Sequence, residues 1–210
     1  SFNETDFSLV DSLAEQAGLA IHNADIMNLQ IEKNKLDLDL VLASNIQRML
    51  LPKNFPQKPG LEVDARYLPA QKVGGDLYDV FSVGRDKIGV AIADVSGKGI
   101  PASLLMAICQ SNLRHFAKNC SSPALVLSRL NAVLNEEMSK DMFVTLVYAI
   151  VDPKKDEIII ARGGHELPLL GHKDEKTNLF RTRTIGSEGM ALGMVPAKLF
   201  EEVIEDKIIT

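Results

Sequence analysis

A stretch without proline, from residue 6 to residue 50, is the feature that most limits how this chain can fold. Gly18 is the only glycine in it, and apolar residues recur there at helical spacing. Pro52 stops a helix, and two more prolines and a glycine follow before residue 61. We therefore predict one long N-terminal helix that ends at Leu51–Pro52, with a different kind of structure after it.

The second half of this helix carries a heptad-like pattern. Successive positions of this pattern, from Ile26 to Leu50, are alternately three and four residues apart. The pattern covers about three and a half heptads, which is the minimum for a coiled coil. Lys33 and Gln47 fill two of the positions, and the apolar ones are Ile26, Leu29, Leu36, Leu40, Ala43 and Leu50. Two interpretations stay open: a helix that packs on its own domain, or a helix that joins two copies of the chain, which we favour.

After the proline-rich break the pattern changes to strands around a pair of helices. Such an order predicts an α+β fold with largely antiparallel sheets. Helices are expected at 101–118 and 123–139, the second with Ser122 as its cap. The expected strands cover 61–67, a hairpin within 80–93, 143–151, 157–162, 168–171, 179–184, 190–192 and 200–210.

The composition narrows the classes of function. The 210 residues carry a net charge of −5, which argues against a nucleic-acid-binding protein. Cys109 and Cys120 are the only cysteines and belong to no metal-binding array, so we expect no zinc site and a reduced, cytoplasmic setting. No apolar run reaches the roughly 18 residues of a membrane-spanning helix.

Two acidic segments carry the candidate chemistry. They are Val73-Gly-Gly-Asp-Leu-Tyr-Asp79 and Asp94-Val-Ser-Gly-Lys-Gly99. Each places an aspartate beside glycines at the edge of a strand, and a hairpin between them would bring Asp76 and Asp94 together. Because like charges repel, a divalent cation with a preference for oxygen ligands, Mg²⁺ or Mn²⁺, would resolve the clash. The alternative is that Asp76, Asp79 and Asp94 are ordinary turn residues. A phosphate-binding loop is disfavoured, because Gly99 follows Lys98 where that motif has Ser or Thr.

These segments resemble a known family, the RsbU/SpoIIE-type phosphatases of the metal-dependent, protein phosphatase 2C-like group. The first is similar to their VGGDxYD motif and the second, read on to Met106, to their DVSGKGxxAxLLM motif. The lead-in Ile46-Gln-Arg-Met-Leu-Leu-Pro52 and the segments at 122–131, 143–145 and 163–165 also match in order. The resemblance runs from about residue 43 to the C-terminus.

The resemblance implies a fold and a reaction. The fold would be an antiparallel β-sandwich flanked by helices. Asp76 would be a carboxylate ligand, Asp94 the bridging ligand, and Val95 a ligand through its backbone carbonyl, in a centre of two Mn²⁺ or Mg²⁺ ions that activate water. Attack on phosphorus would be direct, without a phosphoenzyme. The substrates would be phosphoserine or phosphothreonine on an anti-sigma-factor antagonist protein.

The chain also departs from the family pattern. The family's remaining aspartates lie in a later TDG segment and beyond, and the sequence reaches Thr210 in the middle of an expected strand without them, so we expect the phosphatase fold to be incomplete at its C-terminal side. Animal relatives carry a histidine two residues after the bridging aspartate, where this chain has Ser96. We expect His165 to be mainly structural.

Residues 1–30 are similar to the closing helix of a GAF sensor domain, through Phe2, Thr5 and Asp6 and then Ile21-His22-Asn23-Ala24. This predicts three parts: the end of a GAF-like domain at 1–27, a signalling helix at 28–52, and a phosphatase domain at 53–210. A homodimer through the helix is expected.

Two hypotheses from different classes follow. The first is a metal-dependent protein serine/threonine phosphatase regulated through its N-terminal helix. The second is a dimeric, non-catalytic signalling or binding module with an incomplete metal site. A nucleotide-dependent kinase is disfavoured by the absence of a phosphate loop and of a catalytic His-Arg-Asp segment.

Overall fold

The computed structural model describes residues 3–69, 72–174 and 178–210. The first element is the helix α1, Glu4–Leu50, which confirms the long N-terminal helix. Contacts within the chain divide it after Ala43, and the compact unit runs from Ser44 to Thr210. The last turns of α1 therefore belong to the compact unit, while the predicted three-part division stays a prediction.

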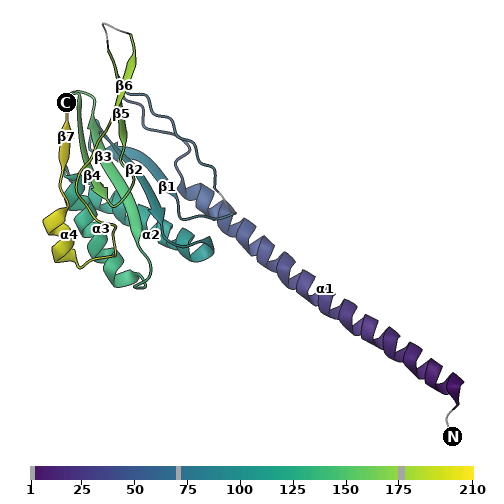
Figure 1. Ribbon diagram of the computed structural model, residues 1–210. Helices are drawn as coiled ribbons and strands as arrows, with labels where there is room; N and C mark the ends of the chain where they lie inside the picture. Colours follow the sequence, from purple (N-terminus) through teal and green to yellow (C-terminus); the bar gives the residue numbers. More distant parts are fainter. Residues whose placement is uncertain (1–2, 70–71, 175–177) are drawn as a thin grey trace. The chain divides into compact units, whose positions relative to one another are not determined.

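A five-stranded antiparallel sheet forms the centre of the compact unit, in the order β1-β2-β3-β4-β7 (Figure 1). The strands are β1 Leu77–Val83, β2 Lys87–Val95, β3 Val144–Asp152, β4 Glu157–Gly163 and β7 Lys207–Ile209. The first four follow one another in the chain and in the sheet, as short antiparallel hairpins allow. The predicted α+β fold with antiparallel sheets is confirmed.

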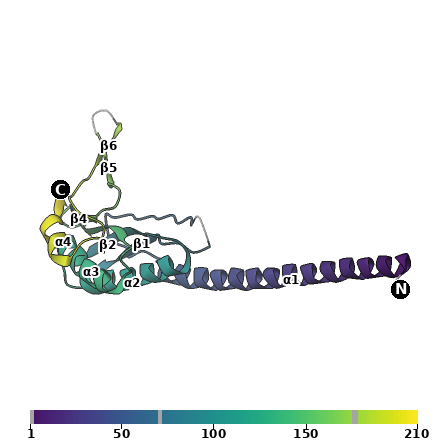
Figure 2. The same cartoon turned by 60° about the horizontal axis from the view of Figure 1, so that its bottom comes forward.

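Three helices lie on one face of this sheet, below it in Figure 2. They are α2 Gly99–Ala117, α3 Pro123–Glu137 and the short α4 Ala197–Val203. Ser122 accepts a hydrogen bond from Leu125 N at 3.1 Å, which confirms it as the cap of α3. Leu113 and Leu130 from the helices are buried in the same core cluster as Leu146 and Tyr148 from β3. This cluster is the main hydrophobic core.

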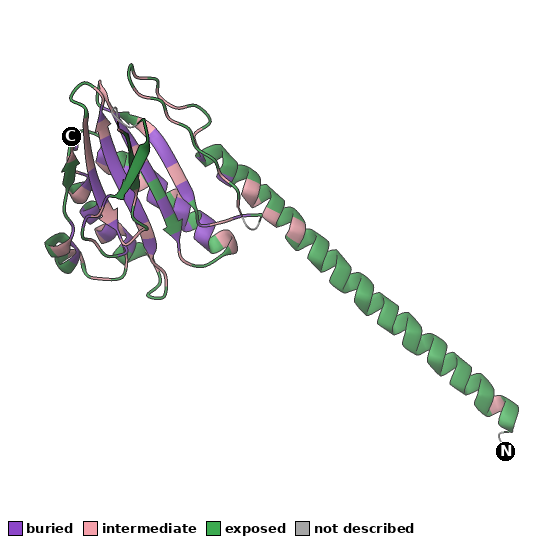
Figure 3. Ribbon diagram, turned by 45° about the horizontal axis from the view of Figure 1, so that its top comes forward, coloured by how far each residue is buried: buried purple, intermediate pink, exposed green. Residues whose placement is uncertain are grey.

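The opposite face of the sheet has a smaller apolar cluster. Val147, Ala149 and Ile160 project there and pack with Ile185, which follows the last strand of a separate hairpin. That hairpin is a two-stranded sheet of β5, Leu169–Lys173, and β6, Phe180–Thr184. Figure 3 shows the contrast between the buried central strands and the exposed hairpin.

The helix α1 is exposed along nearly all its described length (Figure 3). Gln47 is its one buried residue. The heptad pattern left open whether Gln47 faces the chain's own domain or a second helix; its side chain bonds to Gly74 in the compact unit. Within the described residues, no helix combines the length and apolar character that crossing a bilayer requires.

Two predicted strands are not formed, and a third is much shorter than predicted. Residues 61–67 are extended but unpaired apart from a bridge between Leu61 and Lys58. At 190–192 only Leu192 makes a bridge, to Val144. The segment predicted as a strand from 200 to 210 begins within α4 and reaches β7 only at Lys207. There Pro196 precedes a run of good helix formers, and the helix buries Phe200.

Candidate active site

The candidate site is a cleft of about 520 Å³ at the end of the hairpin formed by β1 and β2. Asp76 comes directly before β1, and Asp94 is the last residue but one of β2. The strands pair Leu77 with Ala93, so the two aspartates sit one step beyond this pair. The lining side chains are Arg66, Tyr67, Leu68, Asp76, Leu77, Tyr78, Ile92, Ala93, Asp94 and His165.

The two carboxyl groups interact directly. Burial raises the pKa of Asp94, and the neighbouring Asp76 raises it further through its charge and through a side-chain hydrogen bond. His165 opposes this shift. Two carboxylates that meet in a partly buried cleft repel each other when both are ionised. The predicted meeting of Asp76 and Asp94 is therefore present.

The backbone around Asp76 is held closely. A Cβ atom on Gly75 would clash with the carbonyl oxygen of Val95, and Val95 N donates to Gly75 O at 3.3 Å. Only glycine allows this approach. Val95 is buried and is not among the described residues that line the cleft. Its role as a metal ligand stays a prediction.

Gln47 ties the end of α1 to the same loop. Its Nε2 donates to Gly74 O at 2.6 Å, and its Oε1 accepts from Gly74 N at 3.2 Å. The amide thus satisfies both backbone groups of one residue, two positions before Asp76. Gln110 of α2 donates to Leu50 O at 2.9 Å, so the end of α1 is also joined to the helix layer.

Asp79 has a different role from Asp76 and Asp94, although it belongs to the same acidic segment. Its carboxylate is fully buried and accepts two hydrogen bonds from Arg114 of α2, at 2.6 and 2.7 Å. The guanidinium also lies 5.5 Å from the centre of the Phe81 ring. The turn interpretation of Asp79 is wrong, because the residue is a strand position whose charge joins the sheet to α2.

His165 lines the cleft, although we expected it to be mainly structural. Its Nδ1 lies 2.8 Å from Thr145 Oγ1, and the same hydroxyl donates to Asp94 O at 3.4 Å. Burial lowers the pKa of His165, while Asp94, Glu166 and Asp76 act in the opposite direction. The sequence signal for this position is the Gly163-Gly164 pair before it, which allows a sharp turn at the end of β4.

Sequence reasoning missed three other residues near the site. Arg66 is the one permanently cationic side chain among the described residues that line the cleft. Tyr67 has a buried hydroxyl with no hydrogen-bond partner among the described residues. Burial and the charge of Asp76 raise the pKa of Tyr67. Thr145 orients His165. Arg66 and Tyr67 come from a segment that forms no regular strand, and Thr145 comes from β3, far from both aspartates in the chain.

The donor set fits Mn²⁺ or Mg²⁺ in part. Both ions prefer oxygen ligands, and Mg²⁺ is commonly held by one or two carboxylates with several waters. Asp76 and Asp94 supply such oxygens. Within the described residues, no group of three or more His, Cys, Asp or Glu side chains is close enough to hold a metal by itself.

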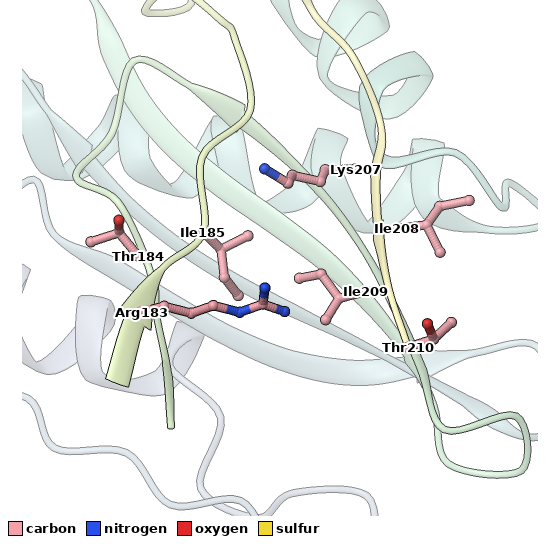
Figure 4. A pocket seen from close by; sticks show the side chains of 7 residues that line it. All are labelled: Arg183, Thr184, Ile185, Lys207, Ile208, Ile209 and Thr210. Atoms are coloured by element: carbon pink, nitrogen blue, oxygen red, sulfur yellow. The ribbon is translucent and has the colours of Figure 1, made fainter. Parts of the chain in front are cut away.

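A second pocket differs from the cleft in the charge of the side chains that line it. It has a volume of about 220 Å³ and lies between the end of β6 and β7 (Figure 4). Arg183 and Lys207 project towards it, and none of its described lining residues is acidic. It therefore offers no carboxylate side chain for a divalent cation among its described lining residues, and the cleft remains the candidate active site.

The fold and the paired carboxylates define the class of protein as a protein phosphatase 2C-like domain. The PP2C domain of SiaA from Pseudomonas aeruginosa superposes on this chain with a TM-score of 0.62 at 18% identity. The match covers 84% of this chain and 68% of that one. The RsbU and RsbW domains of Rv1364c from Mycobacterium tuberculosis give 0.53 at 20% identity, covering 68% and 38%. At these identities the likeness establishes the fold.

The sequence places the chain more narrowly. The family model of stage II sporulation protein E, SpoIIE, matches residues 84–206, and the chain belongs to this family. Phosphoserine phosphatase RsbU of Bacillus subtilis is 30% identical over 195 residues, which is 92% of this chain and 57% of RsbU. The chain thus spans little more than half the length of that relative. The similarity to a GAF helix stays a prediction, and Phe2 lies outside the described residues.

Proposed function

We propose that this chain carries a metal-dependent protein serine/threonine phosphatase activity directed at phosphoserine or phosphothreonine. The observation that carries the proposal is the meeting of Asp76 and Asp94 in one cleft, where burial and the charge of Asp76 raise the pKa of Asp94. Membership of the SpoIIE family supports the same conclusion.

The residues of the cleft have distinct tasks in this reaction. When bound, Mn²⁺ or Mg²⁺ would supply a water-derived hydroxide and neutralise phosphoryl oxygens. Asp76 and Asp94 would hold the ions, with Val95 as a further candidate ligand through its carbonyl. Gly75 and Gln47 keep the loop that carries Asp76 in place. Arg66, at the edge of the cleft, is suited to attract the anionic phosphoryl group.

The proposed substrate is a phosphorylated anti-sigma-factor antagonist protein in bacterial partner-switching signalling. The similarity to RsbU, which is a phosphoserine phosphatase, supports this class of substrate. The proposal includes a cytoplasmic setting, and the unpaired, buried Cys109 and Cys120 support it.

We also propose that the chain forms a homodimer through α1. Large apolar side chains along this helix, among them Leu29 and Leu36, are more than half exposed. A second copy of the helix would bury them in a heptad-like seam. The dimer would give the phosphatase a means of regulation through its N-terminal helix.

The deciding experiment measures hydrolysis of a phosphoserine protein and of p-nitrophenyl phosphate with Mn²⁺, with Mg²⁺ and with EDTA. Wild-type protein and Asp94→Asn are compared. Turnover that requires the metal and falls in Asp94→Asn supports the proposal. No turnover with either metal would contradict it for this chain and favour a dimeric, non-catalytic binding module.

A further inference from the structure

The backbone that carries His165 is held at the wall of the cleft. Arg162 Nη1 donates to His165 O at 2.8 Å, and Arg162 Nε donates to Ser187 O at 3.1 Å. Gly164 has a φ of 69°, and a Cβ there would lie 2.5 Å from Ala191 N. The backbone before the histidine therefore has little freedom to shift.

Thr145 holds the Nδ1 side of the His165 ring, so Nε2 is the nitrogen left for the cleft. The Thr145 hydroxyl donates to Asp94 O at 3.4 Å, and a carbonyl can only accept. When the hydroxyl proton points to Asp94 O, Thr145 Oγ1 accepts from His165 Nδ1, 2.8 Å away; in the other tautomer Thr145 donates to Nδ1 instead. The other nitrogen, Nε2, is then left to act in the cleft.

Ser96 is poorly suited to donate a proton in the cleft. It stands where related animal enzymes have a histidine, but its hydroxyl accepts a hydrogen bond from Phe143 N at 2.8 Å. Its backbone N–H donates to Phe143 O at 2.9 Å. Ser96 is thus used to join the end of β2 to the start of β3, and an alcohol is a poor acid near neutral pH.

The other lining groups are no better as proton donors. Asp76 and Asp94 are the candidate metal ligands, and Arg66 holds its proton too tightly. The Tyr67 hydroxyl is buried away from solvent, and its pKa is raised. Among the described lining residues, His165 alone combines exposure to the cleft with an acid strength suited to neutral pH.

We propose that His165 is a catalytic residue, the general acid whose Nε2–H protonates the serine or threonine oxygen that leaves phosphorus. This inference rests on the proposed function. Thr145 is its positioning residue. The geometry of the cleft and the fixed Nδ1 contact carry the assignment, and the burial that lowers the pKa of His165 makes its imidazolium form a stronger acid.

The oxygen of the attacking water forms a bond to phosphorus and releases one proton to solvent, as the bond from phosphorus to the seryl oxygen breaks. The electron pair of the broken bond stays on the seryl oxygen, which takes the proton from His165 Nε2. The imidazole becomes neutral, keeps its Nδ1–H on Thr145, and regains a proton from solvent. The products are inorganic phosphate and the free hydroxyl.

The experiment compares two leaving groups with the 210-residue chain and Mn²⁺. A phosphoserine protein has a strongly basic leaving oxygen that needs a proton, whereas p-nitrophenolate leaves without one. His165→Asn keeps a polar group that can bond to Thr145 but lacks Nε2. We expect kcat on phosphoserine to fall about 100-fold or more, with less than about a three-fold change on p-nitrophenyl phosphate. His115→Asn, at an exposed position of α2, is the matched control and should change neither rate.

A second readout is independent of turnover. NMR of the imidazole nitrogens should show His165 protonated at Nδ1 in its neutral form, and Thr145→Val should remove this preference while Thr145→Ser restores it. Equal losses on both substrates in His165→Asn, or no loss on phosphoserine, would overturn the assignment. A neutral form protonated at Nε2 would also overturn it. A wild type inactive on both substrates would instead refute the proposed function, and the assignment with it.

Discussion

Residues 4–43 and residues 44–210 differ in where their apolar side chains lie. In the first region Leu13, Leu29 and Leu36 are 56%, 66% and 58% exposed. In the second, Leu113, Leu130 and Leu146 are fully buried in one cluster. The helical region has no core of its own, and the compact region has one that is shared by its sheet and helices.

This difference indicates which interactions stabilise each region. A single helix in water gains little from its own hydrogen bonds, and in proteins most of its stability comes from packing. The proposed dimer would give the first region a partner surface, whereas the second is stabilised by contacts within itself. Substitutions in the compact region should change its stability and chemistry, and those in the exposed helix should change association.

The largest effect is expected from Arg114→Leu. The substitution leaves the carboxylate of Asp79 buried without a partner, which is costly inside a protein. Because the guanidinium itself is 46% exposed, we expect the lower end of the usual range, a loss of about 3 kcal/mol in the free energy of unfolding. Urea denaturation followed by circular dichroism measures it.

The control removes both charges. Asp79→Leu combined with Arg114→Leu leaves no buried charge, so it should recover at least half of the loss. If Arg114→Leu alone lowers the free energy of unfolding by less than about 1 kcal/mol, the ion pair contributes little to the stability of the compact region. The association state should be the same in all these variants.

Asp94→Asn should separate function from stability in the compact region. Loss of a proposed metal ligand is expected to lower Mn²⁺-dependent turnover about 100-fold. The metal-free variant should unfold at a higher temperature than the wild type, because the repulsion that raises the pKa of Asp94 is removed. Differential scanning calorimetry with EDTA tests this, and a lower unfolding temperature would contradict the direct interaction of the two carboxyl groups.

The same substitution at two places on α1 tests where the compact region begins. Gln47→Leu leaves both backbone groups of Gly74 without their partner and should cost about 1–3 kcal/mol. It should also weaken Mn²⁺ binding, because the loop before Asp76 is less fixed. Gln30→Leu removes only an exposed contact with Asn34 and should change stability by less than about 0.5 kcal/mol. Equal effects in urea denaturation would place Gln47 outside the compact region.

The sequence was sufficient to predict those structural features that depend on residues close together in the chain. Proline at 52 predicted the end of α1, and Ser122 before Pro123 predicted the start of α3. The meeting of Asp76 and Asp94 could also be predicted, because a hairpin brings residues just outside its paired strands together. These inferences needed only backbone geometry and the chemistry of single residues.

Contacts across the chain could not be predicted in this way. Heptad spacing left open what Gln47 faces, and a buried hydrogen bond to Gly74 determines its position. Thr145 and His165 meet because β3 and β4 are neighbours, and nothing local indicates that their side chains bond. Asp79 did carry a signal: it lies on the same face of β1 as Leu77 and Val83, which are buried in the core, so its carboxyl group needed a partner there.

The smallest effect on folding, and the clearest on association, is expected from Leu29→Asp. Sedimentation of the wild type should show a dimer, since α1 exposes a row of apolar side chains that a second helix would cover. A charge at the centre of this seam should give a monomer. Gln30→Asp adds the same charge beside the seam and should leave the dimer intact. Both variants should unfold within about 0.5 kcal/mol of the wild type, measured on the compact region. A monomeric wild type would mean that another surface covers the helix, and the proposed homodimer would then be wrong while the division between the two regions would stand.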